Sequence, residues 1–74
     1  MPVRKRSVTI AGHRTSYSVE DEFFTLLRRA AESENRSLAS LIAAIDEARP
    51  RDSNLSSALR LYVLDAALNG RFTR

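Results

Sequence analysis

The sequence predicts a mainly α-helical fold with a short β segment near its start. Three observations predict it. Residues 7–18 are rich in β-branched and hydroxyl side chains, and polar and apolar residues alternate along them. Apolar side chains then recur at helical spacing in three stretches. Capping or turn residues separate these stretches. The chain has 74 residues, 43% of them apolar, and no cysteine, which indicates one small domain without disulfides. The hydrophobic core of so small a domain contributes only about 3–5 kcal/mol to the free energy of unfolding, so we expect the chain to bury further apolar surface against a second copy of itself.

A straight strand over the β segment would be out of phase. Val8 and Ile10 precede Gly12 on the face that Arg14 would share, so the alternation changes phase at the glycine. A type II′ turn at Gly12-His13 restores the alternation, because it sets Ile10 opposite Thr15 and Val8 opposite Tyr17. A bulge at Ala11-Gly12 is the intermediate arrangement. We favour a hairpin or a bulge over a continuous strand.

A first helix is predicted over residues 19–34. Ser18 can cap its free amides, and the acidic residues that follow favour the positive end of the helix. A polar turn at 35–37 separates it from a second helix over 38–48, for which Ser37 is the expected cap and which ends before Pro50. Each of these helices has an apolar face at regular spacing.

A third helix is predicted over residues 54–69, and Asn69-Gly70 ends it. Its apolar residues cover more than one stripe of the helix, which is too much for the surface of a monomer. We interpret this helix first as part of the core of a dimer. A protein partner held by the 54–69 helix is the second hypothesis.

The positive charge is concentrated at the N-terminus. The net charge is +3, and residues 1–19 contain four basic side chains and no acidic one, whereas the remainder has eight basic and nine acidic side chains. We therefore expect residues 1–6 to form a flexible basic arm whose Arg4, Lys5 and Arg6 contact nucleic-acid phosphates; a solvated leader is the alternative. Neither a membrane span nor a signal-peptide core is apparent, so we expect a cytoplasmic protein.

The residues for catalysis are missing from the sequence. It has one histidine, no cysteine and no glycine-rich phosphate loop, and its carboxylates are scattered over predicted helix surfaces. His13 lies at a predicted turn, where a lone imidazole is more often a surface residue than a metal ligand. We therefore expect no enzyme activity, no cofactor and no metal.

Two stretches resemble the ribbon-helix-helix family, the Arc/MetJ-type DNA-binding proteins of bacteria and phage. One is Arg14-Thr15-Ser16-Tyr17-Ser18-Val19 before an acidic helix start, and the other is Asn35-Arg36-Ser37-Leu38-Ala39-Ser40-Leu41-Ile42 at the second helix. The whole chain is similar to a proteobacterial branch with an extra C-terminal helix. The resemblance implies a homodimer that regulates transcription by binding double-stranded DNA, with a β-ribbon from both chains in the major groove.

The resemblance also implies which residues contact DNA. If Tyr17 and Val19 face the core, the alternation turns Arg14, Ser16 and Ser18 toward the bases, and arginine can bind guanine with two hydrogen bonds. The start of the second helix, with Ser37 and the neighbouring Arg36, would hold a phosphate.

Each of these roles has an alternative. Arg14 could instead bridge to Glu20 or Glu22 on the surface, and Ser37 could act as a helix cap alone.

A hairpin makes the insertion of the sheet into DNA more difficult. Two paired hairpins place four strands side by side, about 14 Å between the outer strand axes, which is too wide for deep insertion into a groove about 12 Å wide. The alternative function is a dimeric protein-interaction module, antitoxin-like or an adaptor, with little or no specific DNA binding; the wide apolar coverage of the 54–69 helix motivates it.

Overall fold

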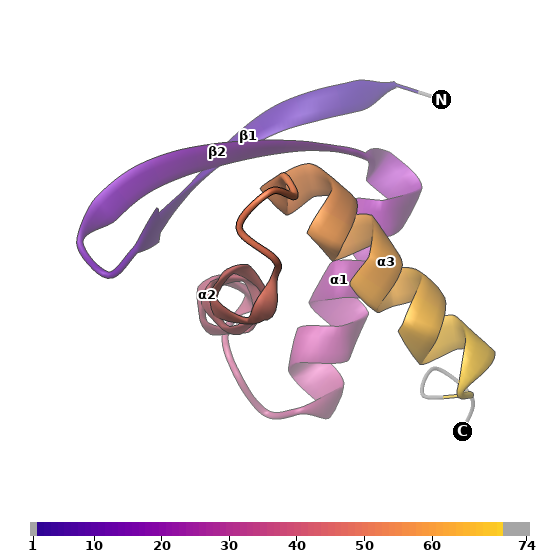
Figure 1. The fold of residues 1–74 in the computed structure, drawn as a ribbon. Coiled ribbons are helices and arrows are strands. Elements are labelled where there is room, and N and C mark those ends of the chain that lie inside the picture. Colours follow the sequence, from indigo (N-terminus) through magenta and orange to yellow (C-terminus); the bar gives the residue numbers. More distant parts are fainter. Residues whose placement is uncertain (1, 71–74) are drawn as a thin grey trace.

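The computed structural model describes residues 2–70 and shows a two-stranded antiparallel sheet followed by three helices (Figure 1). The elements are β1 (Val3–Ile10), β2 (His13–Glu20), α1 (Asp21–Ser33), α2 (Leu38–Ala48) and α3 (Leu55–Leu68). The predicted fold class, a mainly helical chain that begins with a strand or hairpin, is confirmed. The second helix has the predicted bounds, and the third begins and ends within one residue of them.

The hairpin turns one residue earlier than predicted. Its two turn residues are Ala11 and Gly12, both with positive φ (51° and 82°), which is the pattern of a type I′ turn and not of the expected type II′ turn at Gly12-His13. Ile10 therefore lies opposite His13, and Val8 opposite Thr15. The predicted pairing was wrong by two residues, a shift that leaves every side chain on its predicted face.

Ala11 gives the hairpin a strained position that a substitution can relieve. An alanine at positive φ places its Cβ close to the backbone, whereas asparagine tolerates this region and Asn-Gly is the preferred type I′ pair. We expect Ala11→Asn to raise the free energy of unfolding by about 0.5–1 kcal/mol. Urea unfolding followed by circular dichroism would measure it, and a destabilised variant would contradict the assigned turn.

The strand β2 continues directly into α1. Glu20 is the N-cap of α1 and makes no side-chain capping hydrogen bond, so the expected cap at Ser18 is wrong: Ser18 remains in the strand, opposite Lys5. The other two helices have the side-chain caps that their sequences indicate. Ser37 Oγ accepts the amide of Ser40 at 3.0 Å, and the side chain of Asn54 caps α3 in the same way.

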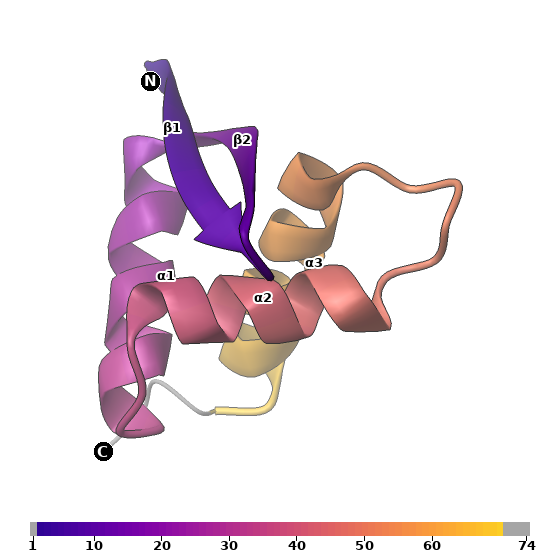
Figure 2. The same ribbon diagram turned by 90° about the vertical axis from the view of Figure 1, so that its left-hand side faces the viewer.

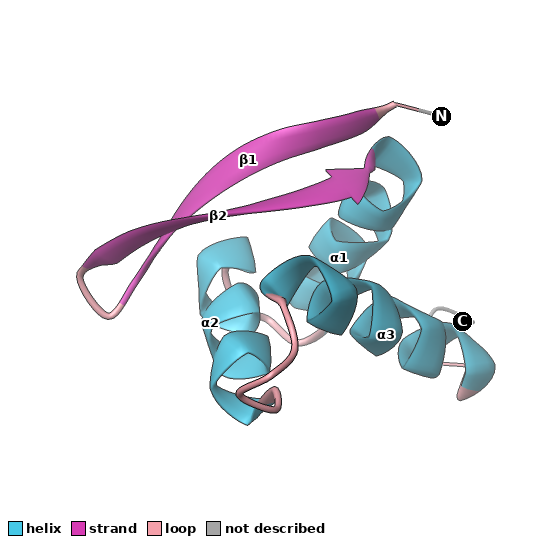
Figure 3. Ribbon diagram, turned by 45° about the horizontal axis from the view of Figure 1, so that its top comes forward, coloured by secondary structure: helices cyan, strands magenta, loops and turns pink. Residues whose placement is uncertain are grey.

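Residues 3–6, which we expected in a flexible arm, are the first half of β1 and pair with the end of β2. The physical reason lies in α1, whose Asp21 carboxylate holds Arg4 and Arg6 at 3.2 Å each. Figure 3 shows β1 along its whole length beside β2, with the tip of the hairpin extending past the helices.

The core lies between the inner face of the hairpin and the three helices. Figure 2 shows α2 crossing in front of α1, and α3 packs against β2, α1 and α2. One side of the third helix belongs to this core, where Leu59 is 0% exposed. Fully buried side chains come from β2 and from every helix: Val19, Leu27, Leu41, Ile42, Leu59 and Val63. Within residues 2–70, none of the helices is both long and apolar enough to cross a membrane.

Candidate nucleic-acid interface

The two faces of the hairpin differ in chemistry. Tyr17 and Val19 are buried against the helices, and burial raises the pKa of the Tyr17 phenol. Arg14 and Ser16 are exposed on the opposite face, as the alternation predicts, and Ser18 is partly exposed there. This outward face of the sheet, away from the helices, is called the outer face below.

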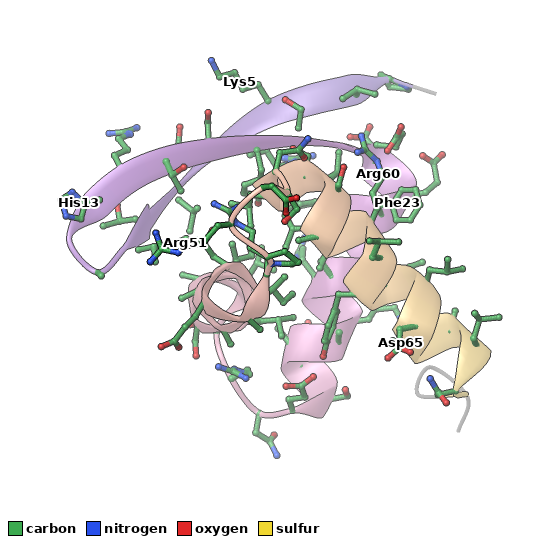
Figure 4. All side chains as sticks on the ribbon, viewed as in Figure 1. Lys5, His13, Phe23, Arg51, Arg60 and Asp65 are labelled. Atoms are coloured by element: carbon green, nitrogen blue, oxygen red, sulfur yellow. The ribbon has the colours of Figure 1, made fainter. Side chains whose placement is uncertain are left out.

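The strand β1 completes the outer face with a second row of polar side chains. The pairing places Lys5 opposite Ser18, Ser7 opposite Ser16, and Thr9 opposite Arg14. Lys5 points away from the helices (Figure 4). The outer face thus combines two cations with four hydroxyl groups and, over residues 4–18, no acidic side chain: Lys5, Ser7, Thr9, Arg14, Ser16 and Ser18.

Arg14 makes no ion pair or side-chain hydrogen bond within residues 2–70. The alternative role, a bridge to Glu20 or Glu22, is not observed, because Glu20 instead binds the Nε of Arg60 at 3.0 Å. An exposed guanidinium without a partner keeps all its donors for a ligand. Arg14 is therefore the side chain of the outer face best able to hold an anionic or base-edge acceptor.

Arg4 and Arg6 do not join the outer face. They lie opposite Val19 and Tyr17, and so belong to the inner side of the sheet. Arg6 is also held by α1: its guanidinium lies 3.6 Å from the centroid of the Phe24 ring and forms the ion pair with Asp21, and only its buried Nε has no hydrogen-bond partner within residues 2–70. Of the three basic residues expected to reach phosphates, only Lys5 lies on the outer face.

Arg36 and Ser37 lie away from the hairpin within one protomer, because α1 runs from β2 toward the turn that holds them (Figure 1). The Arg36 guanidinium donates to Ser40 Oγ at 2.9 and 3.1 Å and forms an ion pair with Glu34 at 3.4 Å. Ser37 acts as the cap of α2. The structure thus brings Arg14, Ser16, Ser18 and Lys5 together, but not these two residues.

A second surface lies between α2 and α3. An open groove of about 480 Å³ is lined mainly by apolar side chains, with alanines on the α2 side and Leu61 and Tyr62 on the α3 side. Three leucines of α3 are more than half exposed on the surface of the domain: Leu61, Leu64 and Leu68. The wide apolar coverage predicted for the third helix is thus observed, and part of it is open.

With this geometry in view, a comparison with family models identifies the fold. The model of the ribbon-helix-helix domain matches residues 3–67. The chain belongs to the ribbon-helix-helix domain family. Such domains are in general DNA-binding, dimeric and non-enzymatic, and the match includes the hairpin and nearly all of α3. Searches of curated proteins and of solved structures find no match to this ribbon-helix-helix domain.

The sequence did not reveal three residues that organise this ribbon-helix-helix domain around β2. Asp21 holds the two inner arginines, while Ser56 and Arg60 in the first turns of α3 bind the backbone of Ser18. The partners are as many as 42 residues apart in the chain. No local spacing could indicate them, because only the packing of α3 against β2 brings them together.

The Glu20–Arg60 pair makes stability depend on pH. The hydrogen bond from Arg60 lowers the pKa of Glu20 below its ordinary value of 4.5. A carboxyl with a lowered folded-state pKa stabilises the fold above its unfolded-state pKa, and this contribution disappears as the pH falls through the folded-state value. We therefore expect Glu20→Gln to lower the free energy of unfolding at pH 7. Its difference from the natural chain should shrink as the pH falls below 4.5 and vanish below the folded-state pKa of Glu20.

Chemical unfolding at a series of pH values would measure this difference. Glu47→Gln is the matched control, because it removes the same charge from an exposed position of α2. A gap between the natural chain and Glu20→Gln that stays constant down to pH 3 would refute the stabilising pair.

Proposed function

We propose that this ribbon-helix-helix domain is a homodimeric, sequence-specific DNA-binding regulator of transcription, acting in the bacterial cytoplasm. The observation that carries the proposal is the outer face of the hairpin, where Arg14 is exposed and unpartnered among hydroxyl groups and Lys5. Arginine can read guanine with two hydrogen bonds, and serine hydroxyls can donate to or accept from several bases. The family match supports DNA as the partner.

The observed hairpin changes how such a dimer would dock. Four strands span about 14 Å between their outer axes, slightly more than a major groove about 12 Å wide. We infer that the two β2 strands lie over the groove and the two β1 strands lie over its phosphate walls. Arg14 and Ser16 of β2 then face the base edges, whereas Lys5 of β1 meets phosphates.

The start of α2 is the proposed second anchor. Ser37 and Arg36 lie at the N-terminus of a helix of 11 residues, where free amides and the helix dipole favour a phosphate. Since Arg36 is bound to Ser40 and Glu34, it would have to exchange these partners for the phosphate. Its contribution is therefore expected to be smaller than that of Arg14.

Selection of bound duplexes from a pool of random DNA, at a stated salt concentration, tests the proposal. A regulator built on two-fold symmetry should enrich a motif with two related half-sites. Enrichment of no sequence, with an affinity that depends only on salt, would contradict sequence-specific regulation and leave charge-driven binding.

A second candidate function is a dimeric protein-interaction module with little specific DNA binding. The apolar groove between α2 and α3, beside the exposed Leu61, favours it. Two measurements distinguish the two candidate functions. Analytical ultracentrifugation gives the oligomeric state, and binding of a hydrophobic dye reports exposed apolar surface. A dimer that leaves no apolar patch open, together with a selected DNA motif, would remove the reason for this second candidate.

A further inference from the structure

The side chain of Arg14 has no polar anchor that fixes its direction. Its guanidinium makes no ion pair or side-chain hydrogen bond within residues 2–70. An arginine that rotates freely loses conformational entropy when it binds a base, and this loss weakens binding. Any neighbour that restricts the rotation of Arg14 before binding therefore improves its reading of DNA.

Thr9 lies directly opposite Arg14 on the outer face of the hairpin. Ile10 and His13 flank the two-residue turn and form a hydrogen-bonded pair, so the next pair, Thr9 and Arg14, is a non-hydrogen-bonded one. In such a pair the Cα atoms are about 4.5 Å apart and the two side chains are close together. Thr9 is thus the cross-strand neighbour of Arg14.

The neighbours of Arg14 along its own strand are small. Gly12 lies two residues toward the turn and has no side chain, and Ser16 lies two residues toward α1. Among the outer-face residues between positions 4 and 18, Thr9 is the only β-branched one. A β-branched side chain is stiff at χ1 and therefore occupies a fixed volume. A serine in its place would leave the space of a methyl group beside Arg14.

The backbone of Thr9 is fixed from the inner side of the sheet. Val8 and Ile10, its two neighbours in β1, are partly buried and pack against the hydrophobic core. Thr9 itself is exposed, but it lies on a segment of β1 that core contacts hold on both sides. A stiff side chain on a fixed backbone can orient a flexible neighbour.

Building on the proposed DNA-binding function, we propose that Thr9 is a positioning residue for Arg14, whose β-branched side chain prevents Arg14 from lying across β1 and directs it at a base edge. In this arrangement the Cγ2 methyl of Thr9 packs along the methylene stem of Arg14, and the guanidinium stays free for a guanine. The strand β1 then contributes to sequence reading without touching a base.

Two substitutions separate the shape of Thr9 from its hydroxyl group. Thr9→Val keeps the β-branch and removes the hydroxyl, whereas Thr9→Ser keeps the hydroxyl and removes the methyl. The readout is base discrimination, which is the ratio of the affinities for two duplexes at one stated salt concentration. One duplex carries the selected motif, and the other has adenine in place of the guanine whose preference disappears in Arg14→Ala.

We expect Thr9→Ser to lower this ratio about threefold to tenfold, because Arg14 then also adopts orientations that miss the base. Thr9→Val should keep the ratio of the natural chain. In a chain that already carries Arg14→Ala, replacing Thr9 by serine should leave the ratio unchanged, since a positioning residue acts only through the residue that it positions. A merely structural role of Thr9 would not depend on Arg14 in this way.

The reverse pattern would overturn the proposal. If Thr9→Val weakens binding to both duplexes and Thr9→Ser does not, the hydroxyl holds a phosphate and Thr9 does not position Arg14. The proposal is also wrong if both variants keep the ratio of the natural chain, or if Thr9→Ser lowers the ratio equally with and without Arg14.

A measurement without DNA separates this inference from the proposed function. Nuclear magnetic relaxation of the Arg14 Nε–H group reports its motion on the ps–ns timescale. We expect more motion in Thr9→Ser than in the natural chain or in Thr9→Val. Equal motion in the three chains would contradict the packing of Thr9 on Arg14, even where a DNA motif is selected. If no motif is selected, the proposed function fails, and the motion of Arg14 alone decides whether Thr9 restricts it.

Discussion

Replacing Leu59 by alanine is expected to remove most of the stability of the fold. Leu59 lies in the first half of α3, is 0% exposed and packs in the core with residues of β2, α1 and α2. Truncating a leucine in such a site costs about 2–5 kcal/mol, because the lost transfer free energy adds to that of the cavity left behind. A core of this size supplies only about 3–5 kcal/mol, so the loss is comparable to the whole.

Urea unfolding monitored by circular dichroism would measure the loss, and Leu61→Ala is the matched control. Leu61 is two residues away on the same helix and is 63% exposed, so the same truncation should change the free energy of unfolding by less than about 0.5 kcal/mol. Equal losses at the two positions would show that α3 does not pack in solution as it does here.

Replacing Arg14 by alanine is expected to have the largest effect on DNA binding. On the proposed function, Arg14 reads a base through two hydrogen bonds, so its loss should weaken binding to the selected site by about 1–3 kcal/mol, or roughly 5- to 150-fold per arginine. Binding to unrelated DNA should change much less. The preference for one base position should disappear, because the contact that distinguishes guanine is removed.

Lys5→Ala is the control for Arg14→Ala, since Lys5 lies on the same face but on the outer strand. A phosphate contact there should weaken binding to all sequences about equally and lower the salt slope by about one per contact. Titrations of the selected and an unrelated duplex at several salt concentrations separate the two effects. If Arg14→Ala lowers affinity for both duplexes equally, the base-reading role is wrong.

Local sequence patterns predicted a large part of this structure. The bounds of α2 and α3 were predicted to within one residue, because capping residues and Pro50 determine them within a few neighbouring residues. The separation of Tyr17 and Val19 from Arg14 and Ser16 was also predictable, since alternation along a strand fixes the face of each side chain. The candidate readers on β2 therefore follow from sequence alone, although their role in binding stays a prediction.

The hairpin register and the start of α1 were not predictable in the same way. Both Gly12-His13 and Ala11-Gly12 give turns that keep the alternation, and the choice between them is one of turn twist and cross-strand packing. The observed register places Arg6 opposite Tyr17, over Phe24 and within reach of Asp21. Ser18 was predicted as a helix cap from its neighbours in the sequence. The contacts that keep it in the strand come from α3, far along the chain, and local patterns do not indicate them.

By itself the sequence determined which segments are helical, which strand residues face the core, and that positive charge gathers near the N-terminus, because these properties depend on neighbours within a few residues. Only the tertiary structure decided which of those charges remain available. Asp21 binds Arg4 and Arg6 on the inner side of the sheet, where Phe24 also contacts Arg6. Arg60 forms an ion pair with Glu20. Arg14 and Lys5 remain on the outer face. The reason is that a charge is neutralised by what lies beside it in space, and in this fold those partners come from different elements of the chain.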